Sequence, residues 1–340
     1  MRTLSIALLC AGATLASCTH TPLAVVDSAE IPATPSLRGL SRVDAQHAWV
    51  SGSGGAVARS DDGGQSWELV QPDDVAELDF RDVHAFSWDQ AVLMSAGEGS
   101  ASNLLRTDDG GDSWQLIATN DAPKGFWDGI AFWDAQYGLL VGDPVNGRLT
   151  VMNTSDGGRS WNTLATESAP QSIEGEFAFA ASGTSVALQP GGLAWIATGG
   201  SRAQVYRSTD FGQSWQTVDT PITAASAGAG IFSIDFRDAQ NGVVVGGDYL
   251  APEKRHNIAA YTTDGGRSWT AATEGFEPGG YRSGLSWSSS LKVWIAVGPD
   301  GADFSPDGRR WTALESTGFH SVDQEWASGG RGRVGRVISD

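Results

Sequence analysis

The sequence predicts an all-β protein built from repeated four-stranded units. Three observations carry this prediction: an eight-residue phrase that returns along the chain, 44 glycines among short apolar runs, and little sign of helix. The phrase first reads Ser60-Asp61-Asp62-Gly63-Gly64-Gln65-Ser66-Trp67, and its later copies, the last one residue short, close at Trp114, Trp161, Trp215, Trp269 and Trp311. Spacings of 42 to 54 residues between these tryptophans are typical of a repeat architecture.

Each copy of the phrase is expected to close a tight turn between two strands. The aspartate can accept hydrogen bonds from backbone N–H groups a few residues on, and the glycine after it can adopt a positive φ. The tryptophan then enters the next strand and buries its ring against a neighbouring repeat. We therefore expect a structural role for the repeated aspartates: Asp62, Asp109, Asp156, Asp210, Asp264 and Asp307.

The repeats follow one another from residue 37 to residue 340. Each reads as an inner strand, a second strand ending in a Gly-rich loop, a third strand running into the phrase, and a fourth starting at its tryptophan. After the sixth phrase only three strands remain, at 319–322, 325–327 and 333–338. The apolar run 23–26 is predicted to supply the fourth. The units are expected to begin near residues 37, 80, 126, 174, 231, 281 and 319.

The phrase resembles the Asp box, or BNR repeat, of sialidase-type β-propellers. The segments 106–111, 141–144 and 246–249 also resemble the bacterial relatives of the photosystem II stability/assembly factor, across nearly the whole mature chain. This resemblance implies a seven-bladed β-propeller, closed by an N-terminal strand that completes the C-terminal blade. It implies function less directly, because propellers host many chemistries.

The N-terminus reads as an export signal. Arg2 precedes the apolar stretch 4–13, which is too short to span a membrane, and 15–18 resembles the lipobox of bacterial lipoproteins. We expect residues 1–17 to be a signal peptide, Cys18 to be lipidated, and 18–36 to hold the anchor, a short linker and the closing strand. An ordinary signal peptide with a chance cysteine is the alternative. The expected location is the cell envelope, periplasmic or at the outer membrane, with the phrase-bearing face towards the membrane.

Composition excludes several classes of partner. A net charge of −18 and the lack of a basic run argue against nucleic acid. The five histidines have no metal-like spacing, the two cysteines both lie at or before position 18, and no nucleotide-binding glycine motif is present, so no metal or cofactor is expected. A closed propeller has few free edges, which favours a monomer.

Candidate functional residues lie at the starts of the inner strands, where the units differ and their side chains meet around the axial tunnel. The candidates for ligand binding are Arg38, Arg81, Asp82, Trp127, Arg282 and His320. The candidates for acid or base chemistry are Asp128, Glu176, Asp143 and Asp248. Three interpretations remain open: the charges pair and plug the tunnel, they bind a ligand or partner, or they catalyse a reaction.

Two functions follow from these residues. The first is a non-catalytic binding or assembly module, as the assembly-factor resemblance implies, acting on an envelope protein. The second is a glycoside hydrolase related to the sialidases, or a glycan-binding protein. The nearest equivalents of the sialidase arginine triad and tyrosine are Arg38, Arg81, Arg282 and Tyr281. Tyr281 and Arg282 are adjacent in one strand, however, so their side chains should point to opposite faces, which argues against a true sialidase.

Overall fold

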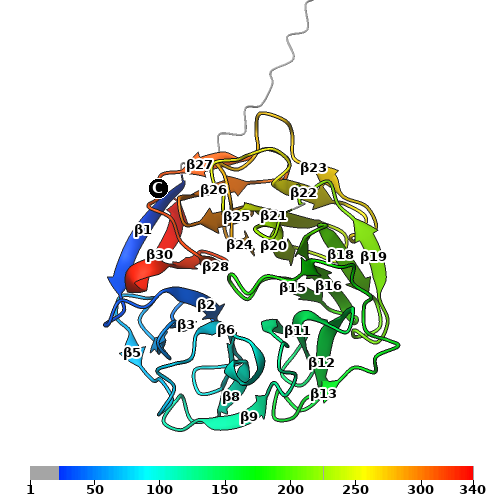
Figure 1. The fold of residues 1–340 in the computed structure, drawn as a ribbon. Helices are drawn as coiled ribbons and strands as arrows, with labels where there is room; N and C mark the ends of the chain where they lie inside the picture. Colours follow the sequence, from blue (N-terminus) through cyan, green and yellow to red (C-terminus); the bar gives the residue numbers. More distant parts are fainter. Residues whose placement is uncertain (1–22, 225, 340) are drawn as a thin grey trace, which may run out of the picture.

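The computed structural model describes residues 23–224 and 226–339, which form seven small antiparallel sheets arranged in a ring (Figure 1). The predicted all-β, seven-bladed β-propeller is confirmed. The proposed signal peptide and Cys18 lie outside the described residues. Within the described residues, no helix is both long enough and apolar enough to cross a membrane.

Blades 1 to 3 each run outward from the centre in chain order. Their strands are β2 (Leu37–Arg42), β3 (Ala48–Gly52), β4 (Val57–Ser60) and β5 (Glu68–Leu69); β6 (Phe80–Ala85), β7 (Ala91–Ser95), β8 (Asn103–Thr107) and β9 (Gln115–Thr119); and β10 (Trp127–Phe132), β11 (Gly138–Val145), β12 (Arg148–Thr154) and β13 (Asn162–Thr163). A short 3₁₀ helix, η1 (Gly99–Ala101), precedes β8.

Blades 4 to 6 repeat this order. Their strands are β15 (Val186–Gln189), β16 (Leu193–Ala197), β18 (Gln204–Ser208) and β19 (Gln216–Asp219); β20 (Ala229–Phe236), β21 (Gly242–Asp248), β22 (Ala259–Thr262) and β23 (Thr270–Ala271); and β24 (Gly284–Ser288), β25 (Val293–Gly298), β26 (Gly301–Ser305) and β27 (Thr312–Leu314).

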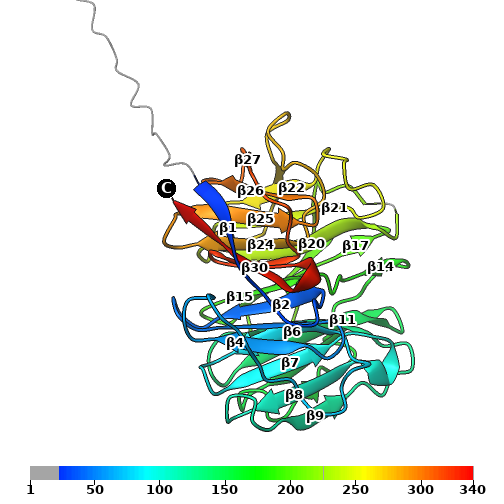
Figure 2. The same cartoon turned by 90° about the vertical axis from the view of Figure 1, so that its left-hand side faces the viewer.

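Blade 7 joins the two ends of the described chain. It contains β28 (Ser321–Asp323), β29 (Trp326–Ser328), β30 (Arg333–Ser339) and, outermost, β1 (Leu23–Glu30), with the 3₁₀ helix η2 (Gly330–Gly332) before β30. Leu23 lies opposite Ser339 in the antiparallel pair, and Figure 2 shows β1 beside β30. The predicted closure by the N-terminal strand is therefore confirmed, and it removes the open edge that three strands would leave.

The repeated phrases form turns between the third and fourth strands of the blades. Asp62 Oδ1 accepts the backbone N–H of Ser66 at 2.9 Å, and Oδ2 accepts the Ser66 hydroxyl at 2.6 Å. Four later turns repeat both bonds, at Asp109, Asp156, Asp210 and Asp264. In the shorter sixth turn Asp307 accepts the N–H of Arg309 at 2.9 Å. These turns, called repeat turns below, close hairpins as expected.

The hydrophobic core lies between neighbouring blades. The second strands contribute its largest side chains, the fully buried Trp49, Trp195, Trp294 and Trp326. The tryptophan of the next repeat turn packs edge-on against such a ring: Trp114 lies 6.1 Å from Trp49 at 88°. Edge-to-face packing suits the quadrupoles of the two rings, so each turn also fixes the adjacent blade.

Blade 4 departs from the predicted pattern. Its inner strand is β15, which begins at Val186 rather than near residue 174. The residues before it form β14 (Glu176–Phe177), which pairs with β17 (Gly199–Gly200) on the inner edge of the blade 5 sheet. Residues 178–185, called the central segment below, then cross the middle of the ring and appear in green before β15 (Figure 1).

Candidate functional site

The starts of four inner strands share a β-bulge that aims one side chain at the ring centre. In blade 1, Leu37 pairs with Gly52 and Gly39 with Ser51, so Arg38 is the extra residue. The same interruption singles out Arg81, Asp128 and Phe232 in blades 2, 3 and 5. Bulges re-aim side chains, and these four residues all line one pocket.

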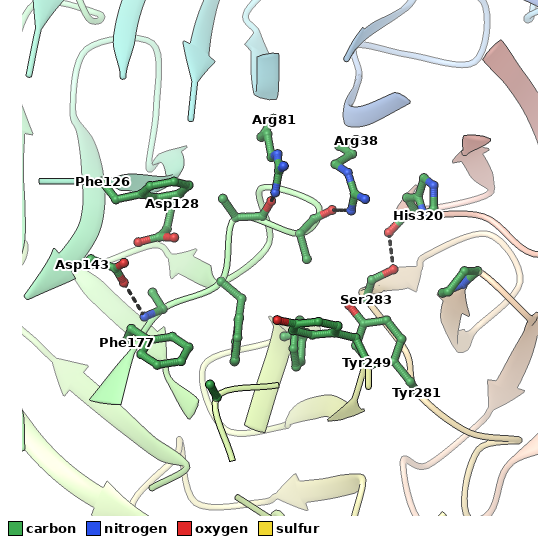
Figure 3. Close-up of a pocket in the computed structure, with 17 residues that line it drawn as sticks. Arg38, Arg81, Phe126, Asp128, Asp143, Phe177, Tyr249, Tyr281, Ser283 and His320 are labelled. Atoms are coloured by element: carbon green, nitrogen blue, oxygen red, sulfur yellow. Dashed lines mark hydrogen bonds between the residues drawn. The ribbon is translucent and has the colours of Figure 1, made fainter. Parts of the chain in front are cut away.

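This central pocket has a volume of about 630 Å³ and lies over the central segment, at the ends of the strands where β2, β6 and β10 begin. Figure 3 shows its layout: Arg38 and Arg81 on one side, Asp128 and Asp143 on a second, and aromatic rings on a third. The central segment runs between them and forms the floor. The tunnel predicted from the sequence is thus divided by backbone.

The two arginines hold the carbonyl groups of the central segment. Arg81 Nη1 donates to the oxygen of Ala180 at 3.1 Å, and Arg38 Nη1 donates to the oxygen of Ala181 at 3.2 Å. Arg81 Nε also donates to Asp79 at 2.8 Å. Burial, followed by the nearby charge of Arg81, lowers the pKa of Arg38. Two cations share this wall, which therefore favours anionic ligand groups.

The two carboxyl groups opposite hold the amides of the same segment. Asp143 Oδ1 accepts the N–H of Ala178 at 3.2 Å, and Asp128 accepts the N–H of Ala180. Burial, followed by the charge of Asp143, raises the pKa of Asp128 well above its usual range, and burial raises that of Asp143 to about 6. Among the described residues no donor faces Asp128 Oδ2. The hydrogen-bond interaction between the two carboxyl groups raises the pKa of Asp128 and lowers that of Asp143, which favours protonation of Asp128.

This carboxyl pair is poorly arranged for glycoside hydrolysis. The two carboxyl groups of glycosidases stand about 5–9.5 Å apart, with the glycosidic bond between them. Asp128 and Asp143 are instead hydrogen-bonded to each other and to backbone amides. Their evident task is to position the central segment.

Aromatic side chains form the third wall. Phe179, from the central segment, stacks on Phe232 with ring centroids 3.7 Å apart, and Tyr281 meets Phe232 edge-on at 4.7 Å. Burial raises the pKa of the Tyr281 hydroxyl. Tyr249, at the end of β21, is 50% exposed at the rim, beside Leu250 at 69%. The pocket therefore combines an apolar wall with two cations.

His320 stands next to the arginines as an uncharged group. Burial, followed by the charges of Arg38 and Arg81, lowers the pKa of its imidazole to about 4. The ring is neutral near pH 7. Its backbone carbonyl accepts the hydroxyl of Ser283 at 2.8 Å, which connects blades 6 and 7 beside the pocket.

Five predicted residues thus meet in the central pocket: Arg38, Arg81, Asp128, Asp143 and His320. Trp127 and Arg282 do not, which corrects the prediction. Trp127 is buried in the core cluster that contains Met94 and Leu140. Arg282 is buried in an ion pair with Asp303, in which its Nε donates at 2.7 Å.

Both errors come from a shift of one residue in the alignment of the units. The bulged residue of blade 3 is Asp128, and in blade 6 Ser283 lines the pocket. Because strand side chains alternate, a one-residue shift exchanges the two faces. Tyr281 and Arg282 do point to different sides, as expected, but Tyr281 is the one at the pocket. No arginine triad assembles.

Three other predicted residues lie elsewhere. Glu176, expected at the tunnel, is buried, and accepts hydrogen bonds from Thr198 Oγ1 at 2.5 Å and from the Tyr206 hydroxyl at 2.9 Å. Asp248 Oδ1 accepts the N–H of Leu250 at 3.0 Å within its own turn. Asp82 lies against Gly183 of the central segment and contacts a different cavity.

The central pocket is also lined by Phe126, Phe177 and Phe179, which were not among the predicted site residues. The run from 177 to 181 reads Phe-Ala-Phe-Ala-Ala, which looks like part of a buried strand, and nothing in it indicates a loop. Among the residues that the structure describes, no group of three or more His, Cys, Asp or Glu side chains is placed to hold a metal ion.

Comparisons with known proteins identify the fold. No family model matches the chain, and no curated protein matches it significantly. Among solved structures, one described as YCF48 bound to D1 peptide aligns with a TM-score of 0.63 and 16% identity, covering 96% of this chain and 100% of that one. YCF48 from Cyanidioschyzon merolae aligns at 0.63 and 17%, covering 92% and 98%. A streptogramin B lyase aligns at 0.67 and 11%, covering 94% and 98%.

Proposed function

We propose that this chain is an exported, lipid-anchored β-propeller that binds a protein of the cell envelope in its central pocket, as a non-catalytic binding or assembly module. One observation carries the proposal: the charged groups around the pocket are engaged with the central segment, so they build a fixed concave surface. A rigid pocket with an aromatic rim suits recognition.

The chemistry of the pocket favours a protein segment as its occupant. Tyr249 and Leu250 supply exposed apolar area at the rim, and aromatic anchors of this kind dominate protein interfaces. Arg38 and Arg81 face them and suit a carboxylate of the partner. One propeller of the same fold is described as bound to a D1 peptide, and the sequence resembles the photosystem II assembly factors. Both facts support a protein client without identifying it.

The alternative, a glycoside hydrolase or sialidase-related enzyme, has less support. The carboxyl pair Asp128 and Asp143 lacks the necessary separation, and Arg282 lies in an ion pair with Asp303. Assays with chromogenic glycosides and sialosides test it directly. Turnover that disappears in an Asp143→Asn variant would favour the enzyme over the binding module.

Anchoring through Cys18 is part of the proposal and has its own test. Labelled fatty acid should enter the full chain expressed in a bacterial host and should not enter the Cys18→Ala variant. Equal labelling of both would contradict a lipid on this residue. The experiment is independent of the central pocket.

The pocket itself is tested by photo-crosslinking in the native host. A benzophenone amino acid replaces Tyr249 at the rim or, as the control, Leu69, which is 43% exposed on the outer strand β5. We expect a defined crosslinked protein from position 249 and none from position 69. The same pattern from both positions would argue against the central pocket as the site.

A further inference from the structure

A second pocket lies between blades 3 and 4, at the opposite strand ends from the central pocket. Its volume is about 470 Å³, and its lining includes Trp133, Tyr137, Asn153, Asn162, Phe211 and Gln213. Trp133 and Tyr137 belong to the turn after β10, and Phe211 belongs to the repeat turn of blade 4. The inner strand β10 begins at the central pocket and ends at this second pocket, so the two pockets do not overlap.

This junction differs at two positions together from three other blade junctions. At those three, an arginine at the end of the third strand reaches the repeat turn of the next blade. Arg106 Nη1 donates to the oxygen of Gly157 at 2.5 Å, and Arg207 Nε donates to that of Gly265 at 2.7 Å. Arg59 lies against Gly110 in the same way.

At the blade 3–4 junction both partners are replaced. Asn153 stands where blades 1, 2 and 4 have arginine, and Phe211 stands where the repeat turns that those arginines reach have glycine. The shorter asparagine leaves the space open, and its Oδ1 is buried without a hydrogen-bond partner among the described residues. A buried, unpaired acceptor beside an open cavity is costly unless a ligand or water supplies the donor.

Phe211 occupies a strained backbone position. Its φ is 60°, in the left-handed region, where the equivalent glycines Gly63, Gly110, Gly157 and Gly265 lie at 73° to 76°. A bulky residue rarely adopts this conformation, and such outliers gather at binding sites. The ring is also 42% exposed, so burial does not compensate for the strain.

The lining defines the ligand class. Phe211 lies 5.2 Å from Trp133 and 6.0 Å from Tyr137, and Tyr137 is 44% exposed. The Trp133 indole is fixed by its Nε1 donating to the oxygen of Leu193 at 2.8 Å. Amide and hydroxyl groups surround these rings, and no charged side chain lines the pocket, although the net charge is −18. Aromatic faces suit the C–H face of a pyranose, and amides suit its hydroxyl groups.

We propose that the blade 3–4 junction is a binding site for a neutral saccharide. The proposal is independent of a protein partner in the central pocket. The sugar ring stacks on Tyr137 and Phe211, and its hydroxyl groups bond to the exposed amides of Asn162 and Gln213. At the three junctions with arginine over glycine, the arginine side chain occupies the corresponding position.

Titration of the purified full chain with tri-N-acetylchitotriose, cellotriose and maltotriose tests this proposal. Isothermal calorimetry and saturation-transfer NMR are the measurements. We expect at least one of these neutral trisaccharides to bind, and Tyr137→Ala to weaken its affinity about tenfold or more. Tyr249→Ala, in the central pocket, should leave that affinity unchanged. No binding of any of the three at millimolar concentration overturns the proposal.

A double variant separates binding from folding. Asn153→Arg with Phe211→Gly introduces the arginine and glycine of those three junctions and should close the pocket. Because glycine relieves the strained φ, we expect an unfolding midpoint at least as high as that of the wild type, with saccharide binding lost. Binding that persists in this folded variant would also overturn the proposal.

Discussion

The carboxyl group of Asp82 in blade 2 accepts a hydrogen bond from the backbone N–H of Ile130 in blade 3, over 2.8 Å. Equivalent bonds join other neighbours: Asp235 accepts the N–H of Trp287 at 2.7 Å, and Asp323 accepts that of Arg42 at 2.7 Å. These carboxyl groups, buried in Asp82 and half-buried in Asp235 and Asp323, lie around the tunnel on the far side of the central segment. They connect the inner strands blade to blade, and their burial makes stability depend on pH.

Replacement of Asp82 by asparagine should change that pH dependence. Burial raises the pKa of Asp82 to about 8, so the folded state retains a proton between about pH 4 and pH 8 that the unfolded chain releases. This carboxyl group therefore makes folding less favourable as the pH rises through that window, by up to about 1.4 kcal/mol per unit. The amide of Asp82→Asn does not titrate, so the variant should gain stability relative to wild type from pH 5 to pH 8, measured by urea unfolding.

Asp62→Asn provides the control. The hydrogen bond from the Ser66 hydroxyl lowers the pKa of Asp62 to about 2, so this carboxylate is ionised in both states above about pH 5. The difference between this variant and the wild type should not change between pH 5 and pH 8. If the stability difference between Asp82→Asn and the wild type also stays constant from pH 5 to pH 8, Asp82 is not protonated in the folded protein.

The central segment should tolerate no side chain at Gly183. This glycine has a φ of 73°, and a Cβ atom on it would lie 2.3 Å from Cγ of Asp82. Gly191→Ala is a matched control, because Gly191 has a φ of 86° with no atom near the added methyl group. We expect the control to cost about 1–2 kcal/mol from backbone strain alone. Gly183→Ala should cost about 1–3 kcal/mol more from the clash.

Chemical denaturation of the two alanine variants measures that difference. Hydrogen exchange at Ala178 and Ala180 adds a local readout, since both amides are bonded to the carboxyl pair. Gly183→Ala should accelerate their exchange and Gly191→Ala should not. Identical stabilities and exchange rates in the two variants would contradict close packing of the central segment against Asp82.

Arg282 is expected to contribute to stability rather than to ligand binding. Its side chain is 5% exposed and that of Asp303 is 2% exposed. Arg282→Met leaves the carboxylate buried without its partner, which should cost about 3–5 kcal/mol. Arg202→Met, which breaks the exposed pair with Asp219, should cost at most about 1 kcal/mol. Equal losses of unfolding free energy in the two variants, measured with urea, would contradict the expected difference between the buried and the exposed ion pair.

The sequence predicted the repeated part of the fold well, because each repeat carries its own local signal. Asp62 and its equivalents specify their turns through contacts within five residues, and β1 was placed by counting strands in an incomplete blade. The central segment had no such signal. Its conformation depends on Arg38, Arg81, Asp128 and Asp143, which lie far away in the chain.

Only some of the residues that line the central pocket were predicted, because the local sequence again lacks part of the necessary information. The starts of the inner strands do surround the central pocket, and Arg38, Arg81 and His320 line it as their alignment predicted. Sequence spacing does not fix the start of an inner strand to within one residue, because the connections between blades differ in length. In blade 3 the residue at the pocket is Asp128 rather than Trp127, and in blade 6 it is Ser283 rather than Arg282.

The most direct test of the central pocket as a protein-binding site is to fill it. Ala227 is exposed and lines the pocket, whereas Ala239 is exposed in the turn between β20 and β21, at the opposite strand ends. The yield of the crosslinked partner from position 249 is measured with Ala227→Trp or Ala239→Trp present. Ala227→Trp should abolish the crosslink and Ala239→Trp should retain it, with both variants unfolding at the wild-type temperature. Equal yields from the two variants would contradict the account.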